Sequence, residues 1–329
     1  MLFTLLLTVT AAGILGGSAA AAEIVASFDP AAGEFPEGIA VGPHGALFVG
    51  LAPLGEVRRL GVDGASTTVH RFPPGTSGFG VLGLAADRYG SVYVAVPSTD
   101  PAAHGVWELP VRGRARRLPG SDRIVFPNGI AIAPRGTLYI TDSVLGAIWR
   151  IPRDGSATLW LQDETIAGTG ELNALLGENP PTPLGANGIA YRNGRLLVAN
   201  TDRKQVVAIP VEHDAAAGPP EVLHRFAGPL DFLDGIAVDI VGNAYLVVAG
   251  TQLVRLDHLT CEARVVAGAV DGLRVPTSLA FGTRATAKRT LYLTNFSPPP
   301  LVALAFGAGA LPEPGIVAIH VPLPGPPLP

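Results

Sequence analysis

The sequence is poor in several residue types, and each shortage excludes a class of protein. Its single cysteine, Cys261, cannot form a disulfide within the chain, and its seven histidines are scattered, so the usual ligands of a structural zinc site are missing. Only two lysines occur, Lys204 and Lys288, and no basic run accompanies the net charge of −4, so we expect no nucleic-acid partner. Charged residues make up 15% of the chain and hydrophobic residues 48%, which favours a packed core over disorder.

Long apolar runs are absent except at the N-terminus. Residues 1–22 are apolar and end in three alanines, which is typical of a secretory signal peptide cleaved after Ala22, although no Lys or Arg precedes the apolar run. No other stretch reaches the roughly 18 uninterrupted apolar residues of a membrane-spanning helix. We therefore expect a secreted or periplasmic protein without an integral membrane span in its mature chain.

A short phrase recurs six times along the chain. Each copy is one variable residue followed by Gly-Ile-Ala or a close variant, and the copies begin at Glu37, Leu82, Asn128, Asn187, Asp234 and Thr277. The intervals between these starts run from 43 to 59 residues. Segments rich in β-branched and aromatic residues follow each copy, mostly after a glycine turn. A period in the forties with strand-like segments is typical of propeller blades.

The sequence therefore predicts an all-β fold, a six-bladed β-propeller over residues 23–320, followed by a proline-rich tail over residues 321–329. The tail cannot supply the last blade's fourth strand, because proline has no backbone N–H to donate. The segment Glu-Ile-Val-Ala-Ser-Phe at residues 23–28 has the missing pattern. We expect this N-terminal strand to pair with the last blade and close the ring, which removes exposed sheet edges.

The first residue of each phrase should lie near the propeller axis, because every blade places its innermost strand there. Four of the six residues carry side-chain oxygens of the carboxylate or carboxamide type: Glu37, Asn128, Asn187 and Asp234. Two carboxylates on an apolar axis repel each other and lose hydration, and a divalent cation offsets both effects. Oxygen donors without His or Cys favour a hard cation, Ca²⁺ or Mg²⁺, and neutral amide oxygens in a wide site favour Ca²⁺.

Turn formation is the competing explanation for the same residues. Asn-Gly and Asp-Gly pairs are strong turn signals and need no metal. Turn chemistry does not, however, explain a glutamate, Glu37, in the same register. We therefore expect one metal site.

At these residues the chain resembles the regucalcin/gluconolactonase superfamily, whose six-bladed relatives include diisopropylfluorophosphatase and the paraoxonases. The matching residues are Glu37 after Pro36, Asn128 after Pro127, Asn187 after Ala186 and Asp234 after Leu233. The resemblance covers roughly residues 23–320 and implies a catalytic Ca²⁺ held by these four side chains. It also implies an enzyme, a hydrolase of lactones, esters or organophosphates. Some relatives bind a second Ca²⁺ through an acidic residue that is Ala237 here, so we expect no such site.

The expected reaction is metal-assisted hydrolysis of a small-molecule lactone or ester. Asp234 is the favoured catalytic base or nucleophile and Glu37 a ligand, with the reverse assignment left open. Residues that end second strands should reach the rim and are candidate substrate contacts, although for any single one an ordinary loop role is favoured: Asp142, Asn200 and Asn295. His104 is a candidate accessory base. Two long connections, residues 161–186 and 296–314, are expected to form an apolar-lined lid.

Two other functions compete with the hydrolase. A non-enzymatic propeller could bind a protein or glycan partner, since propellers serve many functions. Such a module would more readily replace the four oxygen donors and concentrate aromatic residues on its rim. A lyase on a related propeller would favour histidine ligands, which the scattered histidines do not supply.

Overall fold

The computed structural model describes residues 22–329 apart from residues 62–64, 74–79 and 249. The expected signal peptide, residues 1–22, thus lies outside the described residues except for Ala22. No helix in the described part of the chain is long and apolar enough to cross a membrane.

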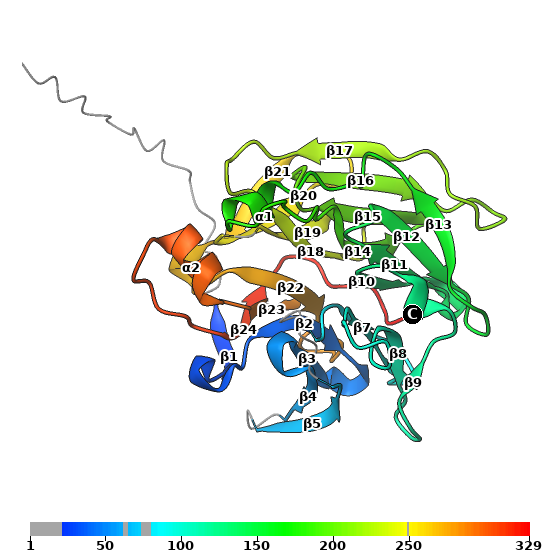
Figure 1. Cartoon of the computed structure of the whole chain (residues 1–329), viewed down its shortest axis with the longest axis horizontal. Helices are drawn as coiled ribbons and strands as arrows, with labels where there is room; N and C mark the ends of the chain where they lie inside the picture. Colours follow the sequence, from blue (N-terminus) through cyan, green and yellow to red (C-terminus); the bar gives the residue numbers. More distant parts are fainter. Residues whose placement is uncertain (1–21, 62–64, 74–79, 249) are drawn as a thin grey trace, which may run out of the picture.

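In the described residues, six four-stranded antiparallel sheets surround a central axis, as predicted (Figure 1). Blade one contains β2 (Pro36–Val41), β3 (Leu47–Leu51), β4 (Glu56–Leu60) and β5 (Ser66–Arg71). Blade two contains β6 (Leu84–Ala86), β7 (Val92–Val96), β8 (Gly105–Leu109) and β9 (Arg116–Arg117). Blade three contains β10 (Pro127–Ile132), β11 (Leu138–Asp142), β12 (Ala147–Ile151) and β13 (Thr158–Gln162).

The second half of the ring repeats this order. Blade four contains β14 (Ala186–Arg192), β15 (Arg195–Asn200), β16 (Gln205–Pro210) and β17 (Glu221–Arg225). Blade five contains β18 (Leu233–Val238), β19 (Ala244–Val248), β20 (Gln252–Leu256) and β21 (Ala263–Ala267). Blade six contains β22 (Pro276–Phe281), β23 (Thr290–Asn295), β24 (Gly315–His320) and, as its outer strand, β1 (Glu23–Ser27).

The ring closes through its N-terminal strand, which confirms the prediction. β1 pairs antiparallel with β24, with Glu23 opposite Ala318 and Ser27 opposite Gly315. Both ends of the propeller therefore belong to one sheet, and separating them would break a strand pair. This pairing gives the last blade its fourth strand and covers the outer edge of β24.

The core lies between neighbouring blades, because each blade's two faces pack on its neighbours. The middle strands are fully buried, as in β19, whereas the outer strand β5 is mostly exposed. One cluster joins Val206 and Ala208 of blade four to Leu246 and Val254 of blade five. The middle strands are therefore mostly apolar, and the outer strands carry more exposed polar residues.

The proline-rich C-terminus forms no strand and crosses the bottom of the ring, where it is drawn in red in Figure 1. Backbone hydrogen bonds tie it to blade six (Gly325 N to Lys288 O, 2.9 Å), blade five (Ile240 N to Pro324 O, 2.9 Å) and blade two (Arg88 N to Pro329 O, 3.1 Å). Pro326 to Pro329 close an axial cavity of about 230 Å³ lined by the inner strands. We call residues 324–329 the C-terminal strap.

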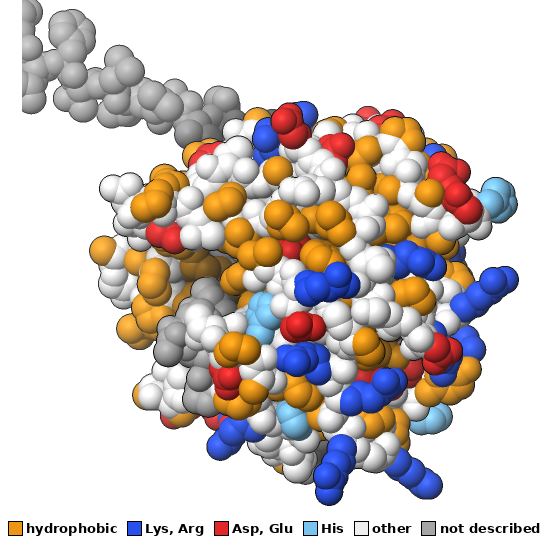
Figure 2. All heavy atoms as spheres, turned by 45° about the vertical axis from the view of Figure 1, so that its right-hand side comes forward, with side chains coloured by type: hydrophobic (Ala, Val, Ile, Leu, Met, Phe, Trp, Pro, Cys, Tyr) orange, Lys and Arg blue, Asp and Glu red, His pale blue; other side chains and the backbone are white. Residues whose placement is uncertain are grey.

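Two short helices lie in the two long connections. α1 (Glu171–Leu175) follows blade three, and α2 (Pro299–Phe306) interrupts blade six between β23 and β24. Both connections leave the ring at the face where the inner strands begin. On the face seen in Figure 2, Lys and Arg side chains are interspersed with acidic, polar and apolar ones.

Candidate metal centre

The six axial residues form a closed ring, as the glycines that follow them demonstrate. A Cβ added at each of five glycines would lie closer than 3.0 Å to the carbonyl oxygen of the next axial residue: Gly38, Gly83, Gly129, Gly188 and Gly235. The carbonyl oxygens approached are those of Leu82, Asn128, Asn187, Asp234 and Thr277, in that order. The contact between the sixth and first ring residues is a hydrogen bond, in which the Thr277 hydroxyl donates to the carbonyl oxygen of Glu37 at 3.0 Å. We call this arrangement the axial ring.

Glu37 and Asp234 are close enough for each charge to influence the other. Burial raises the pKa of Glu37 well above its usual value, and the charge of Asp234 raises it further. Burial also raises the pKa of Asp234 to about 7, an effect partly offset by a hydrogen bond with the Asn187 side chain. Oε2 of Glu37 is buried and has no hydrogen-bond partner in the described residues. Two carboxylates are thus held together, and no basic side chain of the described residues lowers the pKa of either one.

Hydroxyl groups on the neighbouring strands orient the two asparagines. Ser143 Oγ donates to the carbonyl of Ala186 at 2.7 Å and so can only accept from Asn128, whose Nδ2 lies 3.1 Å away. Thr201 Oγ1 donates to the carbonyl of Leu233 at 2.7 Å and accepts from Nδ2 of Asn187 at 3.0 Å. Each amide nitrogen is therefore committed to a hydroxyl, which leaves the amide oxygen free for another partner.

The four polar side chains of the axial ring fit a hard cation. No three His, Cys, Asp or Glu side chains cluster within the described ranges, so half of any donor set here has to come from amides. Two carboxylates and two amide oxygens match the preference of Ca²⁺ for oxygen ligands. The unpartnered Oε2 of Glu37 is an acceptor that such an ion would satisfy. Glu37, Asn128, Asn187 and Asp234, the residues singled out in the sequence, are thus brought together.

The other two ring positions divide the ring chemically. The Thr277 hydroxyl hydrogen-bonds to the carbonyl oxygen of Glu37 and to Thr294 Oγ1 at 3.1 Å. Leu82 lies between Glu37 and Asn128 in ring order and is 3% exposed. It packs with two buried residues, Ala52 and Phe296, and with three half-buried ones, Phe35, Phe126 and Leu301. One side of the ring is therefore apolar.

The candidate substrate contacts at the strand ends hold loops in place. Asp142 accepts hydrogen bonds from the backbone N–H groups of Val125 at 2.7 Å and Phe126 at 3.0 Å. Nδ2 of Asn200 donates to the carbonyls of Thr165 at 3.2 Å and Ala167 at 3.0 Å, inside the connection that carries α1.

Asn295 is used in the same way as Asn200. Its Oδ1 accepts from Arg274 N at 3.0 Å, and its Nδ2 donates to Gly272 O at 2.8 Å. All three rim residues are 4% exposed or less. Their polar groups are engaged with backbone, so the structure lends no support to a role in substrate binding.

His104 is also engaged at both ring nitrogens. Its Nδ1 accepts from Ser98 N at 3.1 Å, and its Nε2 lies 2.7 Å from the carbonyl oxygen of Ile124. An imidazole held in this way has no free nitrogen with which to take a proton from a substrate. The structure therefore gives no support to His104 as an accessory base and places it in the packing of the second blade's long connection.

The α1 connection is anchored by a carboxylate that the sequence did not distinguish from its neighbours. Asp202, 2% exposed, accepts hydrogen bonds from four backbone N–H groups. The donors are Thr169 (2.9 Å), Gly170 (2.7 Å), Leu172 (3.1 Å) and Leu184 (2.8 Å). The expected lid over residues 161–186 is thus tied to blade four.

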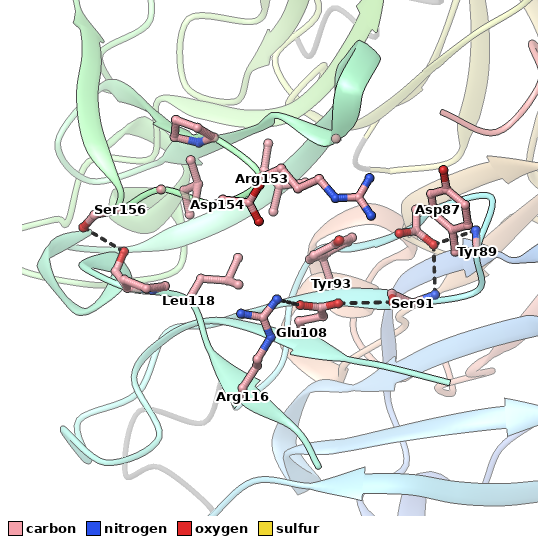
Figure 3. Close-up of a pocket in the computed structure, with 16 residues that line it drawn as sticks. Asp87, Tyr89, Ser91, Tyr93, Glu108, Arg116, Leu118, Arg153, Asp154 and Ser156 are labelled. Atoms are coloured by element: carbon pink, nitrogen blue, oxygen red, sulfur yellow. Dashed lines mark hydrogen bonds and ion pairs between the residues drawn. The ribbon is translucent and has the colours of Figure 1, made fainter. Parts of the chain in front are cut away.

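A larger cavity, of about 690 Å³, lies between blades two and three at the opposite end of the strands (Figure 3). Two of its acidic groups, Glu108 and Asp87, are engaged within the protein. Glu108 pairs with Arg116 and accepts from Ser91 Oγ at 3.2 Å, and Asp87 caps a turn by accepting from Tyr89 N at 2.9 Å. These contacts stabilise the blade ends, and none of the axial residues lines this cavity.

The sequence matches no protein-family profile and no curated protein. The fold, in contrast, is shared with solved structures at low sequence identity. A gluconolactonase from Xanthomonas campestris superposes with a TM-score of 0.62 at 15% identity, over 93% of this chain and 98% of that one. The calcium-binding protein regucalcin from Agrobacterium tumefaciens gives 0.63 at 16%, over 90% and 93%. A streptogramin B lyase gives 0.56 at 15%, over 91% and 97%.

These matches establish the propeller fold and the resemblance to gluconolactonase and regucalcin. Enzymes of more than one reaction class are among the neighbours, so the fold alone does not select a reaction. The choice between reactions depends on the axial ring.

Proposed function

We propose that the chain is a Ca²⁺-dependent hydrolase that acts on a lactone or ester at the axial ring. One observation carries the proposal: Glu37 and Asp234 lie close together in the axial ring. The two asparagines of the ring donate their amide N–H groups to the hydroxyls of Ser143 and Thr201, so their amide oxygens remain as acceptors. Gluconolactonase and regucalcin, named for lactone hydrolysis and calcium binding, share the fold and support this choice. The streptogramin B lyase resembles the chain less closely, by TM-score.

Glu37, Asn128, Asn187 and Asp234 would hold the ion. When bound, the cation would polarise the substrate carbonyl and offset the negative charge that develops on its oxygen. The apolar side of the ring around Leu82 would exclude water from part of the site, which strengthens electrostatic interactions there.

Asp234 is the better candidate for the catalytic carboxylate, and Glu37 for a ligand. Glu37 is 7% exposed and Asp234 is half-buried, so Asp234 is the more accessible of the two carboxylates. In this role Asp234 would take a proton from the attacking water or attack the carbonyl carbon itself. Asn187, which hydrogen-bonds to Asp234, would hold its carboxylate in place.

A panel of lactones and aryl esters, assayed with Ca²⁺ and with chelator, tests the proposal. We expect chelation to abolish turnover, calcium to restore it, and Asp234→Ala to lower kcat/KM by about 100-fold or more. Asp122→Ala, which removes an exposed carboxylate outside the ring, is the matched control. Turnover that survives both chelation and Asp234→Ala would refute the hydrolase. Absence of turnover for the whole panel would favour the non-enzymatic alternative.

We also propose that the protein is exported, on the basis of the apolar segment at residues 1–22. The mass of the protein recovered from the culture medium or periplasm should then correspond to a chain that begins at Glu23. Recovery of the full-length chain from the cytoplasm alone would contradict this.

A further inference from the structure

One hydrophobic cluster forms the apolar side of the axial ring. Leu82, Phe296 and Ala52 are buried in it, and half-buried Phe35, Phe126 and Leu301 pack against them. We call these six residues the phenylalanine cup. Phe35 and Phe296 meet edge to face with ring centroids 6.2 Å apart, which gives the wall a defined shape.

The cup is built into the same segments that position the metal candidates. Phe35 stands two residues before Glu37, and Phe126 stands two residues before Asn128, each followed by a proline. Asp142 accepts the backbone N–H of Phe126 at 3.0 Å and so holds that residue in place. Leu82 lies between Glu37 and Asn128 in the axial ring. If the carbonyl oxygen of a ligand points toward Glu37 and Asn128, the substituent next to that carbonyl would therefore lie beside Leu82.

The polar groups at the rim cannot serve a hydroxyl-rich ligand in their present bonding. Asp142, Asn200 and Asn295 are fully engaged with backbone groups, and Asp202 holds the α1 connection. A sugar lactone buried here would find no free partner for its hydroxyls among these four side chains, and a hydroxyl left without a partner costs free energy. An alkyl or aryl group would instead gain from leaving water.

We infer that the substrate is a lactone or ester with an apolar substituent, seated in the phenylalanine cup, and that hydroxyl-rich sugar lactones are poor substrates. The inference rests on the proposed function for its reaction but makes a separate claim about binding. It distinguishes this chain from a sugar-lactone hydrolase of the same fold.

Two series of compounds test the inference in the Ca²⁺-loaded protein. The first is γ-lactones with side chains from one to six carbons, with glucono-δ-lactone as the hydroxyl-rich comparison. The second is 2-alkylcyclopentanones, which cannot be hydrolysed and report binding alone by calorimetry. We expect kcat/KM and affinity to rise about fourfold per methylene group, since burial of one methylene contributes about 0.8 kcal/mol.

The cup variants Phe35→Ala and Phe126→Ala should flatten this chain-length dependence, so that long-chain compounds lose more kcat/KM and affinity than one-carbon compounds. Phe126→Leu, a smaller change, should give a partial loss if the alanine variant is too unstable to study. Phe226→Ala on the outer part of blade four removes a similar ring that packs on His224, and it should keep the full dependence.

The results separate the two claims. Ketone affinity that is independent of chain length, or a dependence that survives in both alanine variants, would overturn the cup. Preference for glucono-δ-lactone over the long-chain lactones would overturn it as well. Chain-length-dependent ketone binding without hydrolysis of any lactone would support the cup and contradict the proposed reaction.

Discussion

Thr201 determines which atom of Asn187 is turned away from the neighbouring strand. Its hydroxyl proton is committed to the carbonyl of Leu233 at 2.7 Å, so only a lone pair remains for the amide nitrogen of Asn187 at 3.0 Å. Flipping the amide would set two acceptors against each other, which costs a buried hydrogen bond. The identity of the ring's donor atoms thus depends on a hydroxyl outside the ring.

Removing that hydroxyl should weaken cation binding. We expect Thr201→Val to lower Ca²⁺ affinity by about 10- to 100-fold, the range found when groups that orient metal ligands are removed. Calorimetric titration of the metal-free protein with Ca²⁺ measures this directly. Thr201→Ser keeps the hydroxyl and should keep the affinity, as should Ser156→Ala at an exposed site. Equal affinity in Thr201→Val would show that the hydroxyl does not orient Asn187.

Neutralising Glu37 should have opposite consequences with and without metal. Without metal, Glu37→Gln removes a buried carboxylate next to Asp234, so the variant should unfold at or above the wild-type temperature. At a Ca²⁺ concentration of 100 times Kd, the wild type should gain about 2.7 kcal/mol and the variant much less. Thermal unfolding in chelator and in calcium tests both arms, with Glu221→Gln on the exposed strand β17 as control. A variant stabilised by calcium as strongly as the wild type would rule out Glu37 as a ligand.

The close packing of the axial ring should not tolerate a single added methyl group. A Cβ at residue 188 would lie closer than 3.0 Å to the Asp234 carbonyl, so we expect Gly188→Ala to cost about 1–3 kcal/mol of unfolding free energy. Gly268→Ala is the control, since its nearest neighbour would be the Thr251 carbonyl at 3.8 Å. Urea unfolding compares the two. Equal stability of Gly188→Ala and wild type would mean that neighbouring blades separate easily at the axis.

Glu56 should make the stability of blade one depend on pH. Burial tends to raise its pKa, but the hydrogen bonds and charges of Arg58 and Arg71 outweigh burial and lower it. A lowered pKa in the folded state means that the carboxylate stabilises the fold above its unfolded pKa of about 4.3 and loses this effect as pH falls. We expect Glu56→Gln to cost about 1–3 kcal/mol at pH 7, with the difference shrinking below about pH 4.

Urea unfolding of wild type and Glu56→Gln at several pH values measures that difference. Glu262→Gln removes an exposed partner of Arg264 at 3.5 Å and should change little at any pH. A cost for Glu56→Gln that stays constant from pH 7 to pH 3 would contradict the assignment of Glu56 as an ionised, paired group.

The sequence predicted the blades because a repeat is visible without any knowledge of contacts. The six phrases each begin an inner strand or directly precede one, and residues 23–28 contain the closing strand β1. The same register argument gathered Glu37, Asn128, Asn187 and Asp234 at the axis. Both the six blades and the four axial residues were predicted from the repeat and not from local propensity, because equivalent positions in a closed ring of blades lie together at its axis.

The hydroxyls that orient the asparagines could not be found in the same way. Ser143 lies 15 residues after Asn128, whereas Thr201 lies 14 after Asn187, because the intervening turns differ in length. A fixed spacing therefore misses their equivalence. Nor does sequence reveal whether a polar residue at a strand end faces a ligand or its own backbone, and Asp142 and Asn295 prove to do the latter. A signal for the cup was present: phenylalanine stands two residues before the phrase in three blades, at Phe35, Phe126 and Phe232.

The C-terminal strap gives the two ends of the axis different roles. Gly325 is packed so tightly against Phe281 that a Cβ there would clash with the ring, and Pro326 to Pro329 line the axial cavity beside the inner strands. With the strap lying across this end of the axis, we expect a ligand to enter and to leave the axial ring from the opposite face.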